Sequence, residues 1–112
     1  MTKYTVLYNS TASASEVMAA ASPEEMKASM GEWMQWRDEA SDTVKVDFGM
    51  PLQAVSNVSA DGAAESHNPA SGYSILEGES KEAIVELLKK HPHLKRPGAS
   101  IDLLEMLPMQ GM

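Results

Sequence analysis

The sequence contains no cysteine, only 5% aromatic residues and no long hydrophobic segment. The absence of cysteine excludes disulfides, thiolate metal ligands and a cysteine nucleophile, and it fits a cytoplasmic protein. No apolar run approaches the roughly 18 residues that a transmembrane helix needs. The first residues enter a strand pattern directly, without the features of a secretory signal. We therefore expect a cytoplasmic protein that does not associate with a membrane.

Basic residues are also scarce, with 9 Lys and Arg against 16 Asp and Glu, a formal net charge of −7. Nucleic-acid binding requires clustered basic side chains that neutralise phosphates, so we expect no nucleic-acid partner. The glycines are scattered and form no phosphate-binding loop, so no cofactor is expected. The one basic cluster lies at the C-terminal end of a predicted helix and comprises Lys89, Lys90, Lys95 and Arg96. Cations there complement the helix dipole, which is the favoured role, and an anion-binding site is the alternative.

The length of 112 residues and the 43% hydrophobic content indicate a single domain over residues 1–112. Alternating apolar residues predict four strands. These strands cover residues 3–8, 44–48, 72–78 and 100–107. A weaker strand is predicted over residues 52–59, and the composition of residues 60–71 is typical of a loop.

A helix is predicted over residues 23–40, because Ser22, Pro23 and Glu25 form a capping box with proline at the first helical position. A short helical turn is expected before it, over residues 16–21. The spacing of the apolar residues predicts a buried stripe on the long helix. This predicted stripe comprises Met26, Met30, Trp33 and Arg37, with Met34 and Trp36 on its opposite flanks.

A second long helix is predicted over residues 81–90, capped by Ser80 and ended by Pro92. Its predicted buried stripe comprises Ile84, Leu87, Leu88 and His91. Two strand–helix units of this kind predict a ferredoxin-like β-α-β-β-α-β sandwich, an α+β fold with a four-stranded, mainly antiparallel sheet. Right-handed crossovers place both helices on one face of the sheet.

The other face of this sheet has no predicted cover. It is expected to carry Leu104 and Met106, together with Leu76 or Ile75. Apolar residues gathered on an open face mark an interaction surface. We therefore predict a homodimer that forms through the open sheet face.

Four segments, in order and over nearly the whole chain, carry a family resemblance. They are "SPEEMKASMGEWMQW", "DFGMPL", "GYSILEGESKEAIVELLKKHPHL" and "GASIDLLEMLPM". On these segments the chain resembles the YCII-related family, including its DGPF-domain branch. The resemblance implies a ferredoxin-like protomer that pairs into a dimeric α/β barrel, with a pocket between strands and helix. Related barrels carry different chemistries, so the fold does not define the reaction.

The chain departs from this family at two motifs. Many YCII-like proteins carry a histidine on the first long helix, where this chain has Trp33 and Trp36. The segment "SADGAAESHNPASG" stands where the other branch has its "DGPF" tetrapeptide. Asp47, before "FGMPL", does match the acidic position of the family. The histidine of the family's suspected His–Asp pair is thus missing.

Four residues are candidates for a site. Asp47 would be a catalytic base if its strand buries it, or else a solvated carboxylate at a strand end. Arg37 would clamp a carboxylate, or else extend to solvent or pair with an acid such as Asp47. Trp33 and Trp36 are neighbours on the helix and would wall a substrate pocket, or else pack in the core and interface.

Three histidines have roles that the sequence leaves open. His91 and His93 flank Pro92, and two ligands are too few for a metal site. His67 lies on a distant loop. A structural role is favoured for all three, and no metal is expected. Near the C-terminus of a helix the cationic ring is favoured, so we expect His91 to titrate in the physiological range.

Two functions remain open at this point. The first is a small homodimer that binds a small apolar or aromatic acid, with acid/base chemistry of an isomerase, lyase or dehalogenase type. The alternative is a non-catalytic module that binds a ligand or another protein. The sequence does not decide whether the protein is an enzyme.

Overall fold

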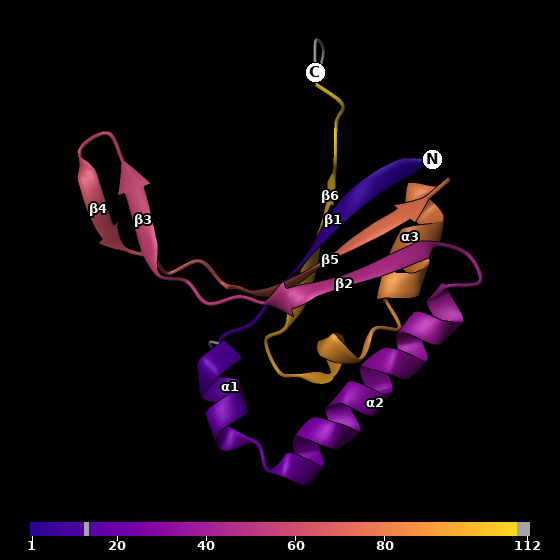
Figure 1. Ribbon diagram of the computed structural model, residues 1–112, viewed down its shortest axis with the longest axis horizontal. Helices are drawn as coiled ribbons and strands as arrows, with labels where there is room; N and C mark the ends of the chain where they lie inside the picture. Colours follow the sequence, from indigo (N-terminus) through magenta and orange to yellow (C-terminus); the bar gives the residue numbers. More distant parts are fainter. Residues whose placement is uncertain (13, 110–112) are drawn as a thin grey trace.

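The computed structural model describes residues 1–12 and 14–109 (Figure 1). These residues form an α+β structure with one four-stranded antiparallel sheet, compatible with a ferredoxin-like α+β fold. The strand order is β2-β5-β1-β6, so β2 and β6 are the edge strands. The bounds are β1 (Thr2–Asn9), β2 (Lys45–Pro51), β5 (Ala70–Gly78) and β6 (Ser100–Glu105).

Strand alternation separates the two faces of the sheet. The pairing Tyr4↔Leu76 and Val6↔Ser74 places these four side chains on one face, where all are buried. The helices α2 (Pro23–Ala40) and α3 (Lys81–Leu88) cover this face (Figure 1). All four predicted main strands are confirmed, because their period of two matches a sheet with one covered face.

Helix α2 (Pro23–Ala40) has the predicted bounds, and the Ser22 hydroxyl accepts the N–H of Glu25 at 3.1 Å. Its predicted buried stripe is wrong, because Trp36 and Ala40 are the buried residues. Only the C-terminal half of α2 lies beside β2 and α3, while its N-terminal half extends toward α1 (Ala14–Ala20) (Figure 1). Met26 and Met30 are therefore exposed rather than buried.

Helix α3 (Lys81–Leu88) begins as predicted after Ser80, whose hydroxyl accepts the N–H of Ala83 at 3.2 Å. It ends two residues earlier than expected, with Lys89 as its C-terminal cap. A short 3-10 helix, η1 (Pro92–Lys95), follows directly and leads into β6. This turn carries His93 back beneath the sheet, where it is buried.

Residues 56–65 form a separate hairpin of β3 (Ser56–Ser59) and β4 (Gly62–Glu65). The prediction of a loop over residues 60–71 is wrong, as is a strand over the whole of 52–59. The hairpin projects from the body (Figure 1), and all its residues are exposed. Because it contacts no core, its sequence lacks the apolar alternation that identified the other strands. Gly62 supplies a φ of 135°, a backbone region that favours glycine.

The uncovered face of the sheet carries both apolar and charged side chains. Ile75 lies on this face, opposite Thr5 on β1, whereas Leu76 belongs to the core. Leu104 also lies here, but Met106 follows the end of β6.

Among the helices of the described residues, none is long and apolar enough to cross a membrane.

Candidate functional site

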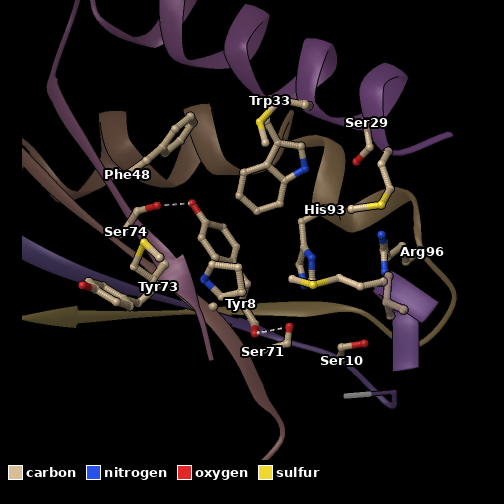
Figure 2. Close-up of a pocket in the computed structure, with 18 of the residues that line it drawn as sticks. Tyr8, Ser10, Ser29, Trp33, Phe48, Ser71, Tyr73, Ser74, His93 and Arg96 are labelled. Atoms are coloured by element: carbon tan, nitrogen blue, oxygen red, sulfur yellow. Dashed lines mark hydrogen bonds between the residues drawn. The ribbon is translucent and has the colours of Figure 1, made fainter. Parts of the chain in front are cut away.

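A cavity of about 510 Å³ lies at one end of the sheet, beside α1 and the N-terminal half of α2 (Figure 2). It forms where β1 and β2 end and β5 begins, so six elements contribute to its wall. The apolar part of the wall comprises Tyr8, Val17, Met18, Met26, Met30, Trp33, Phe48, Met50 and Tyr73. The polar part comprises Ser10, Glu25, Ser29, Ser71, Ser74, His93 and Arg96.

Aromatic rings from three elements pack together in the wall of the cavity. Trp33 of α2 packs edge-on against Tyr8 of β1, with ring centroids 4.8 Å apart. It also contacts Phe48 of β2 in an edge arrangement at 5.9 Å. Such pairs favour edge-to-face geometry and fix the rings in place. The cavity therefore has a rigid aromatic wall on the side of the sheet.

A further aromatic residue, Tyr73, borders the cavity beside Gly49 of β2. A Cβ atom at Gly49 would clash with the Tyr73 ring. The lack of a side chain at position 49 thus allows the ring to pack directly on the strand. The register shift between Phe48 and Pro51 occurs at the same place.

Tyr8 and Ser74 form the polar pair within this aromatic wall. The Tyr8 hydroxyl and the Ser74 hydroxyl are 2.9 Å apart and hydrogen-bonded. Burial raises the pKa of Tyr8 to about 12, an effect that the hydrogen bond from Ser74 partly opposes. A tyrosine of ordinary pKa is already neutral near pH 7, and burial of Tyr8 extends this state to more alkaline solution, so the side chain presents a hydroxyl.

His93 lines the cavity with a buried imidazole. Its Nε2 atom is 2.8 Å from the carbonyl oxygen of Asn9. Burial lowers the pKa of His93, and the positive charge of Arg96 acts in the same direction. The carbonyl groups of Asn9 and Ser100 partly counteract both effects. The neutral ring is therefore favoured while the cavity holds no anion.

His91 lies behind the cavity wall, enclosed by Trp33 and Trp36 at centroid distances of 4.4 Å each. Its Nδ1 atom accepts the backbone N–H of His93 at 3.0 Å, and its buried Nε2 atom has no partner among the described residues. Burial, followed by the neighbouring His93, lowers the pKa of His91 to about 3. The expectation that His91 titrates in the physiological range is wrong, because desolvation outweighs the helix C-terminus.

Of the predicted wall residues, Trp33 lines the cavity and Trp36 does not. Trp36 is buried in the core, and its indole N–H donates to the carbonyl of Leu87 at 2.9 Å. Arg37 also lies outside the cavity. Its guanidinium stands over the Phe48 ring at 5.7 Å and contacts the Asp38 carboxylate at 3.7 Å.

Asp47 is exposed, as expected for the solvated carboxylate and not for the buried base. The reason is that β2 is an edge strand, and alternation directs Asp47 to the uncovered face, opposite Ile75. There it borders a small depression with Lys3, Lys45 and Glu77. Asp47 and Trp33 therefore do not share a cavity, and the catalytic role of Asp47 stays a prediction.

Several cavity residues were missed by the sequence reasoning. Arg96 was assigned, with its basic cluster, to the helix dipole in preference to an anion site, although it follows η1 and reaches the cavity. Ser74 carried the clearest signal, because it is a polar residue at a core-facing strand position, between Gly72 and Leu76. His67 is exposed between β4 and β5. Within residues 1–12 and 14–109, no three His, Asp or Glu side chains are grouped to hold a metal.

No protein-family model matches the chain, and no curated protein matches it. The resemblance to the YCII-related family therefore stays a prediction based on the four sequence segments.

Proposed function

We propose that the cavity binds a small, mainly apolar or aromatic carboxylic acid. One observation supports this proposal above others: a wall of aromatic and thioether side chains has a cationic residue at one end. In Figure 2, Arg96 and Ser10 lie toward one end of the cavity and Phe48 and Tyr73 toward the other. An amphipathic ligand would match this division.

The two ends favour different parts of such a ligand. A guanidinium donates paired hydrogen bonds to a carboxylate, so Arg96 suits the acidic group. The rings of Trp33 and Phe48 suit an aromatic or apolar body, because aromatic contacts add to the burial of apolar area. Between the ends, the Tyr8–Ser74 hydroxyl pair offers a hydrogen bond to a further oxygen of the ligand.

Binding without turnover is favoured over catalysis. Asp47, the predicted base, lies on the opposite face of the sheet, and the sequence supplies no histidine on α2. Acid/base chemistry of an isomerase, lyase or dehalogenase type remains the alternative function. It predicts that Asp47→Asn abolishes any turnover found for the wild type, with ligand affinity unchanged.

We also propose that two copies associate through the uncovered sheet face, as the dimeric α/β barrel that the family resemblance implies. The strand order β2-β5-β1-β6 supports a ferredoxin-like protomer. On the open face, Leu7, Ile75 and Leu104 adjoin across β1, β5 and β6. Burying about 600 Å² of apolar area would contribute roughly 15 kcal/mol before the entropic and desolvation costs of association.

The proposed ligand class is tested with 2-naphthoate and its neutral analogue 2-naphthamide, titrated calorimetrically into the protein. The two probes share an aromatic body and differ in charge. We expect 2-naphthoate to bind roughly tenfold more tightly, the effect of a charge-assisted hydrogen bond. Equal affinities would contradict a carboxylate site, and no binding of either probe would contradict the proposed function as a whole.

A further inference from the structure

Four of the eight methionines within residues 1–12 and 14–109 line the cavity. Met18 lies on α1, Met26 and Met30 lie on α2, and Met50 lies on β2. All four are exposed, by between 45% and 66%. Residues that line a cavity and still contact solvent show that this wall is open, in contrast to the buried wall formed by Tyr8 and Ser74.

We propose that oxidation of these four methionines regulates the cavity, an inference that rests on the proposed binding function. The oxidant is a peroxide, with hydrogen peroxide as the simplest member. The O–O bond breaks, an S–O bond forms, the thioether loses two electrons, and the peroxide is reduced to water. The sulfoxide product is reduced again by a sulfoxide reductase that draws electrons from a thiol, so the modification is reversible.

The composition of the chain leaves methionine as the sulfur group that peroxide can oxidise. There is no cysteine, and thiolates are the groups that are otherwise oxidised first. Oxidation of the remaining sulfur groups follows exposure. The exposed thioethers of Met18, Met26, Met30 and Met50 are thus accessible targets beside the ligand.

The consequence for binding follows from the change in polarity. A methionine side chain is flexible and apolar, and it adapts to the shape of an apolar ligand. A sulfoxide is polar, so its burial against an aromatic ligand costs free energy unless it gains a hydrogen bond. The methionine part of the cavity wall would become polar, and affinity for an aromatic acid would fall.

The chain also supplies matched controls. Met34, Met106 and Met109 are exposed by 37% to 70%, yet they do not line the cavity. Peroxide should reach them as readily as the cavity methionines, without an effect on binding. A bound ligand should protect only the cavity set from oxidation.

The experiment combines peptide mass spectrometry with calorimetric titration of 2-naphthoate before peroxide, after peroxide, and after a sulfoxide reductase with dithiothreitol. We expect the Kd to rise about tenfold on oxidation, equivalent to about 1.4 kcal/mol, and to return on reduction. The variant M18L/M26L/M30L/M50L keeps the apolar volume, so peroxide should not change its Kd. The variant M34L/M106L/M109L should respond like the wild type.

The outcomes separate the two proposals. Oxidation at all four cavity positions with an unchanged Kd would overturn the regulation and leave the binding function intact. An equal rise of the Kd in M18L/M26L/M30L/M50L would also overturn it, because the damage would lie elsewhere. If that variant does not fold, the wild-type protein provides the test. Its Kd should return to the unoxidised value after reduction, and a Kd that stays raised would overturn the regulation. No binding by the unoxidised wild type would overturn both proposals.

Discussion

The buried His91 predicts that the protein loses stability in mildly acidic solution. The residue is 2% exposed, and its ring is enclosed by those of Tyr8, Trp33 and Trp36. Its Nε2 atom finds no hydrogen-bond partner among residues 1–12 and 14–109. A proton added there would place an unpaired charge in an apolar environment, which is why the pKa of His91 falls to about 3.

The size of the effect follows from the difference between the folded and unfolded pKa of His91. The unfolded chain binds the proton near the ordinary pKa of 6.5, and the folded chain only near a pKa of about 3. Above pH 6.5 both states are neutral, and His91 adds no pH dependence. As the pH falls below 6.5, the unfolded state is favoured. At pH 5.5 this lowers the free energy of unfolding by about 1.4 kcal/mol relative to pH 8.

The assay is urea denaturation followed by tryptophan fluorescence, at about pH 8 and about pH 5.5 and at one protein concentration. The control His91→Asn removes the titrating ring and keeps an oxygen that can accept the N–H of His93. This variant is less stable at both pH values, but its loss between them should be smaller by about 1.4 kcal/mol. Equal losses in the two proteins would refute the reasoning that burial keeps His91 neutral.

Three further predictions follow from the cavity and the sheet. Arg96→Gln should weaken 2-naphthoate binding roughly tenfold in calorimetry, whereas the control Arg37→Gln, outside the cavity, should leave the affinity unchanged. Equal effects of the two substitutions would contradict the assignment of Arg96 to the carboxylate of the ligand. Ile75→Glu should convert a dimer to a monomer in sedimentation equilibrium, because it places a charge on the proposed apolar interface; a wild type that sediments as a monomer would contradict that interface. Gly49→Ala should lower the free energy of unfolding by about 1–3 kcal/mol in urea, since the Tyr73 ring must move; an unchanged midpoint would show that the ring yields freely.

Local sequence signals were sufficient for the main elements. Ser22 and Ser80 mark the starts of α2 and α3, because each hydroxyl accepts an otherwise unpaired N–H of the first turn. Alternation in the four main strands predicted the sheet, since each strand has one covered face. The hairpin over residues 56–65 was missed for the opposite reason. Neither face of the hairpin is covered, so its sequence shows no alternation of apolar and polar residues.

Periodicity did not reveal which residues of a face meet the core. Met26, Met30, Trp33 and Trp36 all fit a helical stripe or its flanks, but only Trp36 is fully buried. The difference depends on how far α2 extends beyond the sheet, a property of the packed structure. The same holds for Asp47, whose exposure depends on β2 being an edge strand with one uncovered face.

The sequence by itself therefore determined the order, type and approximate bounds of the main elements, because capping and alternation act over a few neighbouring residues. Only the tertiary structure decided which side chains form a site. It brought Arg96 and His93, from the end of the chain, to Tyr8 and Trp33, and it separated Asp47 and Arg37 from them. The physical reason is that a cavity is formed by strand order and helix placement, which join residues far apart in sequence and leave no local pattern.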